Sequence, residues 1–133
     1  MKPLKLIAFL LLLVSFTQTT QAQNANVPSE VIAALNSGDA GKLASFMNNN
    51  VQLVVNNKNE IYSKQQAVGI ISDFFRHNSV SKFEVLHQGV KEAASFAIGT
   101  LYTSGGKYRV YVLTRKSGNS PVIQQLRIES NNE

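Results

Sequence analysis

The 133-residue sequence contains no cysteine. A disulfide framework, a thiol nucleophile and a lipid-modified cysteine are therefore excluded, and the fold must be stabilised by packing. A nucleophile elbow, a phosphate-binding loop and a calcium-binding loop are also missing. Two histidines, His77 and His87, without cysteine or a paired carboxylate, do not predict a metal site, so we expect no metal and no cofactor.

An N-terminal apolar run, residues 6–16, is too short to span a bilayer. Lys2 and Lys5 precede it, and a polar stretch ending in small residues at Ala22 follows, which is the order of a secretory signal peptide. We expect cleavage after Ala22, which leaves 23–133 as a single domain without a membrane anchor, in the periplasm or outside the cell. Without the two lysines the formal net charge falls from +5 to +3, a weak indication of acidic partners.

Apolar spacing predicts three helices in the first part of the chain. Two short helices, about residues 28–37 and 40–47, come before a longer one that starts at a capping box of Ser63 and Gln66. Between the second and third helices, the apolar segments "VQLVV" and "EIY" flank the turn "NNKN", which predicts a hairpin.

From residue 81 the apolar period changes to two, which is typical of strands. The turn sequences "GVKE", "GG" and "SGNS" separate four strands at about 81–88, 94–103, 107–116 and 121–129. The expected fold class is α+β: two short helices, a hairpin, a long helix, and a four-strand antiparallel meander. The meander curves and packs one face on the helices, which gives a cone.

Two stretches of the sequence, "HQGVKEAASFAIGTLYTSGGKYRVY" and "IQQLRIE", resemble an uncharacterised family of small secreted proteins of Gram-negative bacteria. The order of elements is similar to the nuclear-transport-factor-2-like superfamily, which has a cone-shaped, cystatin-like fold. The likeness covers about residues 27–129. It implies the fold and an inner cavity but no activity, because one fold hosts many functions.

Both faces of the meander carry side chains that suit a core. A two-residue turn at 105–106 predicts that Tyr102 opposes Arg109, and this register aligns large side chains on one face, which we expect to be the core. That face would hold Phe83, Val85, His87, Phe96, Ile98, Tyr102, Arg109, Tyr111, Gln124, Leu126 and Ile128. A bulge in either hairpin would exchange the faces and place Arg109 in solvent, and Gln125 and Arg127 would then be the residues to test.

The leading functional hypothesis is a non-catalytic module that binds a small amphipathic ligand inside the cone. The candidate ligand-binding residues are Arg109, Tyr111, Tyr102, Gln124 and His87. The guanidinium would pair with an anionic group of the ligand, and apolar neighbours would accept the rest of it. Nucleic acid is not an expected partner, because the exported domain is only moderately basic.

Two other hypotheses stay open. The protein could dimerise or dock to another protein through its sheet, because the second face also carries apolar residues. These residues include Leu86, Leu101, Val110 and Val112. An enzyme using His87 and Tyr102 comes third, because no carboxylate falls on the predicted inner face, where general acid–base catalysis would need a desolvated acid.

Overall fold

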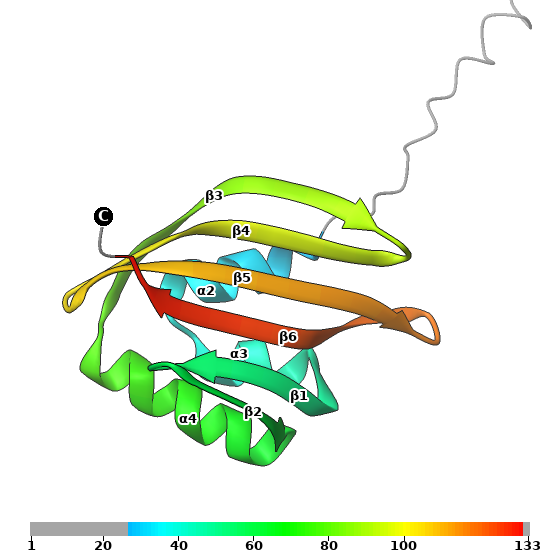
Figure 1. Cartoon of the computed structure of the whole chain (residues 1–133), viewed down its shortest axis with the longest axis horizontal. Coiled ribbons are helices and arrows are strands. Elements are labelled where there is room, and N and C mark those ends of the chain that lie inside the picture. The colour runs from blue at the N-terminus through cyan, green and yellow to red at the C-terminus, as the bar shows by residue number, and fades with distance from the viewer. Residues whose placement is uncertain (1–26, 132–133) are drawn as a thin grey trace, which may run out of the picture.

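The computed structural model of the chain describes residues 27–131 (Figure 1). Its helices are α2 (Ser29–Ser37), α3 (Ala40–Ser45) and α4 (Lys64–His77). Its strands are β1 (Met47–Val55), β2 (Lys58–Ser63), β3 (Val80–Lys91), β4 (Ala94–Thr103), β5 (Gly106–Ser117) and β6 (Ser120–Ser130). The predicted α+β order of two helices, a hairpin, a helix and a meander is confirmed.

The six strands form one mixed sheet in the order β2-β1-β6-β5-β4-β3. The predicted sheet of four antiparallel strands is therefore wrong, because β1 lies parallel to β6 and joins the hairpin to the meander. In this pairing Leu53 lies beside Leu126 and Val55 beside Ile128, and all four side chains are buried. A two-stranded hairpin alone is marginal in water, so joining the larger sheet stabilises β1 by burying its apolar face.

The start of β1 also differs from the prediction. The strand begins at Met47 rather than Val51, and α3 accordingly ends at Ser45. Met47 is buried and pairs with Ile123 of β6. Contact with a strand far away in the sequence therefore overrides the local helical spacing that extended the predicted helix.

Local capping fixes the beginning of two helices. The Asp39 carboxylate accepts a hydrogen bond from the backbone N–H of Lys42 at 3.0 Å and caps α3. At the start of α4 the Ser63 hydroxyl accepts from the backbone N–H of Gln66, and the Gln66 side chain accepts from the backbone N–H of Ser63. This reciprocal capping box confirms the predicted start of the longest described helix.

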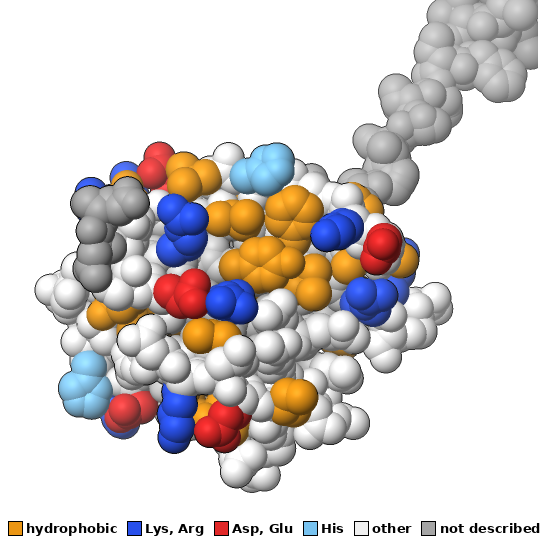
Figure 2. All heavy atoms as spheres, viewed as in Figure 1, with side chains coloured by type: hydrophobic (Ala, Val, Ile, Leu, Met, Phe, Trp, Pro, Cys, Tyr) orange, Lys and Arg blue, Asp and Glu red, His pale blue; other side chains and the backbone are white. Residues whose placement is uncertain are grey.

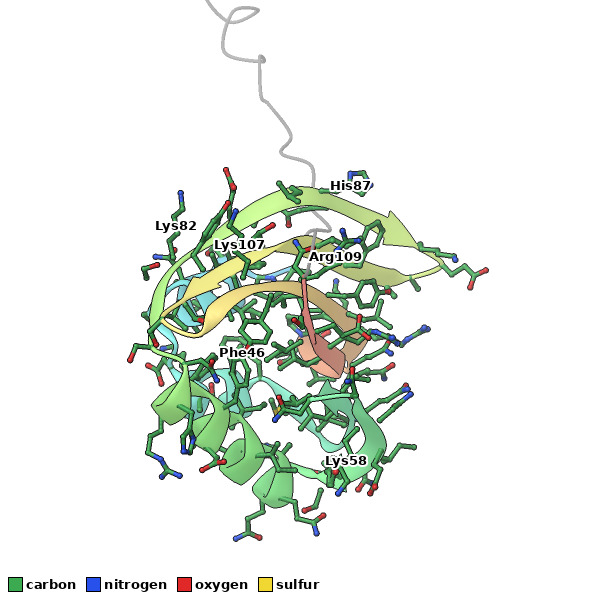
Figure 3. All side chains as sticks on the ribbon, turned by 60° about the vertical axis from the view of Figure 1, so that its left-hand side comes forward. Phe46, Lys58, Lys82, His87, Lys107 and Arg109 are labelled. Carbon is green, nitrogen blue, oxygen red and sulfur yellow. The ribbon has the colours of Figure 1, made fainter. Side chains whose placement is uncertain are left out.

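The helices cover the inner face of the curved sheet, and the outer face is turned away from them (Figures 1 and 3). Apolar side chains from all three helices meet those of the sheet on the inner face. This core includes Val31, Leu35, Leu43, Ile71, Phe74, Leu53, Leu101, Val110, Val112, Leu126 and Ile128. Among residues 27–131, no buried side-chain polar atom lacks a hydrogen-bond partner. The inner face is thus a packed apolar core.

The predicted inner face of β5 is the outer one. Val110 and Val112 have no exposed surface, whereas Arg109 is exposed and Tyr111 is half-buried on the other side of the strand. The turn between β4 and β5 contains Ser104 and Gly105, so the register is shifted by two residues from the predicted one. A shift of two leaves the facing of side chains unchanged. The error therefore lies in the choice of face.

A bulge in β6 separates residues that the sequence analysis placed together. The register shifts between Leu113 and Thr114, where Gln124 is the extra residue on β6. Leu126 therefore pairs with Val112 in the core, while Gln125 pairs with Leu113 on the outer face. The predicted core positions of Leu126 and Ile128 are confirmed, but they do not share a face with Arg109.

A second bulge, at Leu86, has the same effect in β3. Phe83 and Val85 face the helices, whereas His87 pairs with Ile98 on the outer face. The Phe83 ring lies against Gly99, where a Cβ atom would stand 2.7 Å from the ring. A glycine is thus required at this position, because any side chain would displace the ring or the neighbouring strand.

The predicted signal peptide and its cleavage site after Ala22 lie outside the described residues. In residues 27–131, the helices are all too short or too polar to cross a bilayer.

Candidate functional site

The outer face of the sheet has an apolar centre formed by β4 and β5. Ile98 pairs with Tyr111, and Phe96 pairs with Leu113 in the next row. All four side chains are half-buried, and we refer to these four residues as the apolar centre. Figure 2 shows hydrophobic side chains gathered over the middle of this face, with lysine and arginine side chains around them.

Aromatic rings continue the apolar centre across three strands. The rings of Phe96 and Tyr111 are nearly parallel, with an interplanar angle of 17° and centroids 6.2 Å apart. The His87 ring lies 5.5 Å from the Phe96 ring on the other side. Phe96 lies over Gly89 of β3, where a Cβ atom would come within 3.0 Å of the ring. The face therefore has an aromatic row that can contact a flat apolar group.

A shallow pocket lies beside this row. It has a volume of about 410 Å³ and is lined by Ile98, Arg109, Tyr111, Gln125, Arg127 and Glu129. The Arg127 guanidinium donates to the Glu129 carboxylate at 3.0 Å. Within residues 27–131, Arg109 has neither an ion pair nor a hydrogen bond from its side chain. The Arg109 guanidinium is therefore the group in the pocket that is free to bind an anion.

Tyr102 lies on the same face beyond Arg109, among charged side chains. Its hydroxyl donates a hydrogen bond to the Glu84 carboxylate at 3.2 Å. The ammonium groups of Lys82 and Lys107 lie 4.8 Å and 5.5 Å from the centre of the Tyr102 ring, close enough for cation–π attraction. The hydrogen bond to the Glu84 carboxylate raises the pKa of Tyr102 above its ordinary value of 10.0.

Basic side chains outnumber acidic ones on the outer face. The basic residues are Lys82, Lys91, Lys107, Arg109, Arg115 and Arg127, and the acidic ones are Glu84 and Glu129. Both carboxylates are already engaged, Glu84 by the Tyr102 hydroxyl and Glu129 by the Arg127 guanidinium. The face consequently presents an excess of positive charge to solvent.

Four of the predicted ligand-binding residues share this face, but the predicted location inside the cone is wrong for them. Tyr102, Arg109 and Tyr111 point away from the helices, and the Leu86 bulge brings His87 to the same side. Tyr102 pairs with Lys107 rather than with Arg109. The predicted group is therefore largely kept together, on the opposite side of the sheet.

Gln124 does not join the other four residues. It is the extra residue of the β6 bulge, and it does not line the pocket. Gln125 and Arg127 line it instead. The sequence analysis named these two residues for the case in which a bulge exchanges the faces. The sequence analysis also missed the lysines beside Tyr102, because neither Lys82 nor Lys107 is among the residues of its predicted inner face. A Ser104–Gly105 turn would have revealed Lys107 as the neighbour of Tyr102.

Other chemistry is sparse in the part of the chain that the structure describes. Thr100 and Thr114 are its buried polar residues, so every described carboxylate has contact with solvent. No three histidine or acidic side chains within residues 27–131 come close enough to hold a metal ion.

The DUF4783 family, a domain of unknown function, matches residues 28–129. The chain belongs to the DUF4783 family. Crystal structures of DUF4783 proteins from Bacteroides ovatus and Bacteroides uniformis are each 37% identical to it. The first covers 83% of this chain and 100% of its own, with a TM-score of 0.78. The second covers 81% and 100%, with a TM-score of 0.76.

Proteins outside the DUF4783 family share the fold of this domain. An NTF2-like protein of unknown function from Cytophaga hutchinsonii is 14% identical, covers 86% of this chain and 95% of its own, and has a TM-score of 0.58. Such a likeness shows the fold alone. The nuclear-transport-factor-2-like, cystatin-like fold and the uncharacterised family predicted from the sequence are thus confirmed. No curated protein matches the chain.

Proposed function

We propose that this DUF4783 protein is a non-catalytic binding module that holds an anionic, partly apolar ligand on the outer face of its sheet. The observation that carries the proposal is the unpaired Arg109 guanidinium beside Tyr111 and Ile98 in the shallow pocket. A guanidinium offers paired donors to a carboxylate or sulfate, and the neighbouring apolar surfaces accept the rest of the molecule.

The Arg127–Glu129 pair explains how an anion can be tolerated in a pocket that contains a carboxylate. Glu129 lies opposite Arg109 in the strand register, where it would otherwise neutralise the guanidinium. Arg127 engages this carboxylate at 3.0 Å instead. One positive charge of the pocket is left over, which suits a ligand with at least one negative charge.

The inner face supports this choice of location. Side chains of the helices and the sheet pack together there, and the fully buried Val110 and Val112 occupy the positions next to Arg109 and Tyr111 on β5. A ligand at the centre of the inner face, over Val110 and Val112, would have to displace these side chains, whereas the pocket on the outer face is already open to solvent.

Fluorescence titration with 8-anilinonaphthalene-1-sulfonate, an aromatic sulfonate, tests the proposal. We expect Arg109→Ala to weaken binding at least about tenfold, because a hydrogen bond to a charged group is worth roughly 1.5–3 kcal/mol. The matched control is Arg115→Ala, on the same strand and face but outside the pocket, which should change the affinity by no more than about twofold. Equal effects of the two substitutions, in variants with unchanged circular dichroism, would contradict the assignment of Arg109.

We also propose that the protein is exported and that the mature chain begins at Gln23. The support is the order of charged, apolar and small residues in the first 22 positions. N-terminal sequencing of the protein recovered outside the cytoplasm of its host checks this expectation. Retention of residues 6–16 in that protein would contradict it.

A second candidate function is the docking of an acidic protein on the same face. The edge strand β3 exposes Leu86 at its bulge, with a relative exposure of 62%. This side chain extends the apolar surface, while the surrounding positive charge opposes face-to-face pairing of two copies. Val110, predicted as an interface residue, lies in the core instead. Sedimentation velocity distinguishes docking of another protein from pairing of two copies. A dimer that is lost in Leu86→Lys would show self-association through this face.

A further inference from the structure

Three cations gather at the end of the outer face near the turn between β4 and β5. Lys82 and Lys107 flank Tyr102 on the two neighbouring strands, and Arg109 is two residues from Lys107 on the same face. All three are exposed, and none has an ion-pair partner within residues 27–131. Figure 3 labels these three residues on β3 and β5. We call Lys82, Lys107 and Arg109 the cation cluster.

Sheet geometry brings the charged ends of the cluster within reach of one small group. Residues two apart on a strand are separated by about 7 Å, and residues two strands apart by about 10 Å. Lysine and arginine side chains are long and flexible enough to close these gaps. The Tyr102 ring lies between the two lysines, and both ammonium groups are close enough to its centre, at 4.8 Å and 5.5 Å, for cation–π attraction.

Glu84 is the carboxylate that accompanies the cluster. The Tyr102 hydroxyl donates to it at 3.2 Å, which holds the carboxylate beside Tyr102. Three positive charges thus face one negative charge, and two positive charges remain uncompensated at this end of the sheet. A head group with two negative charges matches this excess better than a carboxylate with one.

We propose that the cation cluster binds the doubly charged head group of a phosphate monoester whose apolar part lies along the apolar centre. The inference rests on the proposed function and names its ligand class. Near neutral pH a phosphate monoester carries a charge of about −1.5 to −2 and offers three acceptor oxygens. Arg109 serves both the pocket and the cluster, so the head group lies at the boundary between them, with Ile98 and Tyr111 next along the sheet.

Isothermal titration calorimetry with decyl phosphate and decanoate tests the inference, at concentrations where neither forms micelles. The two probes share the apolar chain and differ in head-group charge. We expect decyl phosphate to bind at least about tenfold more tightly at about pH 7.5, because its second negative charge adds a charge-assisted contact with the cation cluster. Inorganic phosphate should bind far more weakly than decyl phosphate, because it lacks the apolar part.

The double variant Lys82→Gln/Lys107→Gln isolates the role of the lysines. It should lower the affinity for decyl phosphate to about that for decanoate, and change decanoate binding by no more than about twofold. The matched control is Lys42→Gln/Lys58→Gln, which removes the same charge from α3 and β2, away from the outer face. This control should leave both affinities within about twofold, because exposed distant charges are screened by salt.

Each outcome separates the inference from the proposed function. Equal binding of the two probes to the wild-type protein would overturn the phosphate inference and leave the anion pocket standing. Equal losses in the two double variants would show a general charge effect and would also overturn it, as would inorganic phosphate binding as tightly as decyl phosphate. If neither decyl probe nor the naphthalene sulfonate binds to the folded protein, the proposed function itself fails.

Discussion

The inner and outer faces of the sheet are built from alternating residues of the same strands, and they differ in almost every property. On β5, Val110 and Val112 have no exposed surface and pack under the helices, whereas Arg109 and Arg115 are exposed. The inner face holds the fold together, while the outer face carries the unpaired cations and the aromatic row. Substitutions on the two faces should therefore have separable effects, on stability for one and on binding for the other.

The largest expected difference in stability is between alanine substitutions of two phenylalanines, one packed against the inner face of the sheet and one on its outer face. Phe74 on α4 is 4% exposed and packs edge-on against Tyr108 with ring centres 4.9 Å apart. Phe74→Ala should lower the free energy of unfolding by about 3–5 kcal/mol. Phe96→Ala, in the half-buried aromatic row of the outer face, should cost only about 1 kcal/mol. Urea denaturation of both variants checks the contrast, and equal losses would mean that the outer row also belongs to the core.

Alanine substitutions at two glycines should change the stability by smaller amounts. A Cβ atom at Gly99 would stand 2.3 Å from the Glu84 carbonyl oxygen and 2.7 Å from the Phe83 ring. Gly99→Ala should therefore destabilise the fold by about 1–3 kcal/mol through overpacking. A Cβ atom at Gly69 on α4 would meet nothing within 4 Å, so Gly69→Ala should stabilise it by up to about 1 kcal/mol. Thermal unfolding measures both, and a stabilising Gly99→Ala would refute the close packing of β3 on β4.

The smallest expected effect is a change in the pKa of the Tyr102 hydroxyl. Its hydrogen bond to Glu84 raises the pKa of Tyr102 above the ordinary value of 10.0. Removing the carboxylate charge in Glu84→Gln should bring the pKa down towards that value, because the charged acceptor no longer favours the protonated phenol. An NMR titration of the Tyr102 ring carbons follows this change. A pKa that stays the same in Glu84→Gln would show that the hydrogen bond is not maintained in solution.

The raised pKa of Tyr102 in the folded state also determines how the Tyr102–Glu84 contact affects the free energy of unfolding at different pH. The contribution of the Tyr102–Glu84 contact is present at neutral pH and is lost only as the pH rises above about 10, through the pKa of the folded protein. Because Tyr102 lies at the surface, this contribution is small, and the contact matters mainly for holding Glu84 beside the cation cluster.

Local features of the chain were predictable from the sequence. The capping box at Ser63 and Gln66 and the cap at Asp39 involve residues three apart, so their effect is visible in a short window. The two-residue periodicity after residue 81 likewise reflects each strand by itself. These features give the order of the elements and the fold class.

Non-local pairing and single-residue bulges were not predictable in the same way. The pairing of Leu53 with Leu126 joins segments distant in the sequence, and nothing near either residue marks it. The bulges at Leu86 and Gln124 each insert one residue without a glycine or proline signal. One extra residue reverses the facing of the residues on the other side of a bulge, so the sequence analysis aligned Phe83 and Leu126 with Arg109 and chose the wrong face of β5 as the core.

Methyl NMR most directly tests the claim that the ligand binds outside the cone. In protein labelled at the isoleucine δ1 methyl groups, Ile98 reports on the outer pocket, while Ile123 and Ile128 report on the fully buried inner face. On titration with 8-anilinonaphthalene-1-sulfonate we expect the Ile98 resonance to shift with the ligand, because aromatic ring currents act over short distances, and the two inner resonances to stay in place. Shifts of Ile123 and Ile128 with Ile98 unchanged would place the ligand inside the cone and contradict this account.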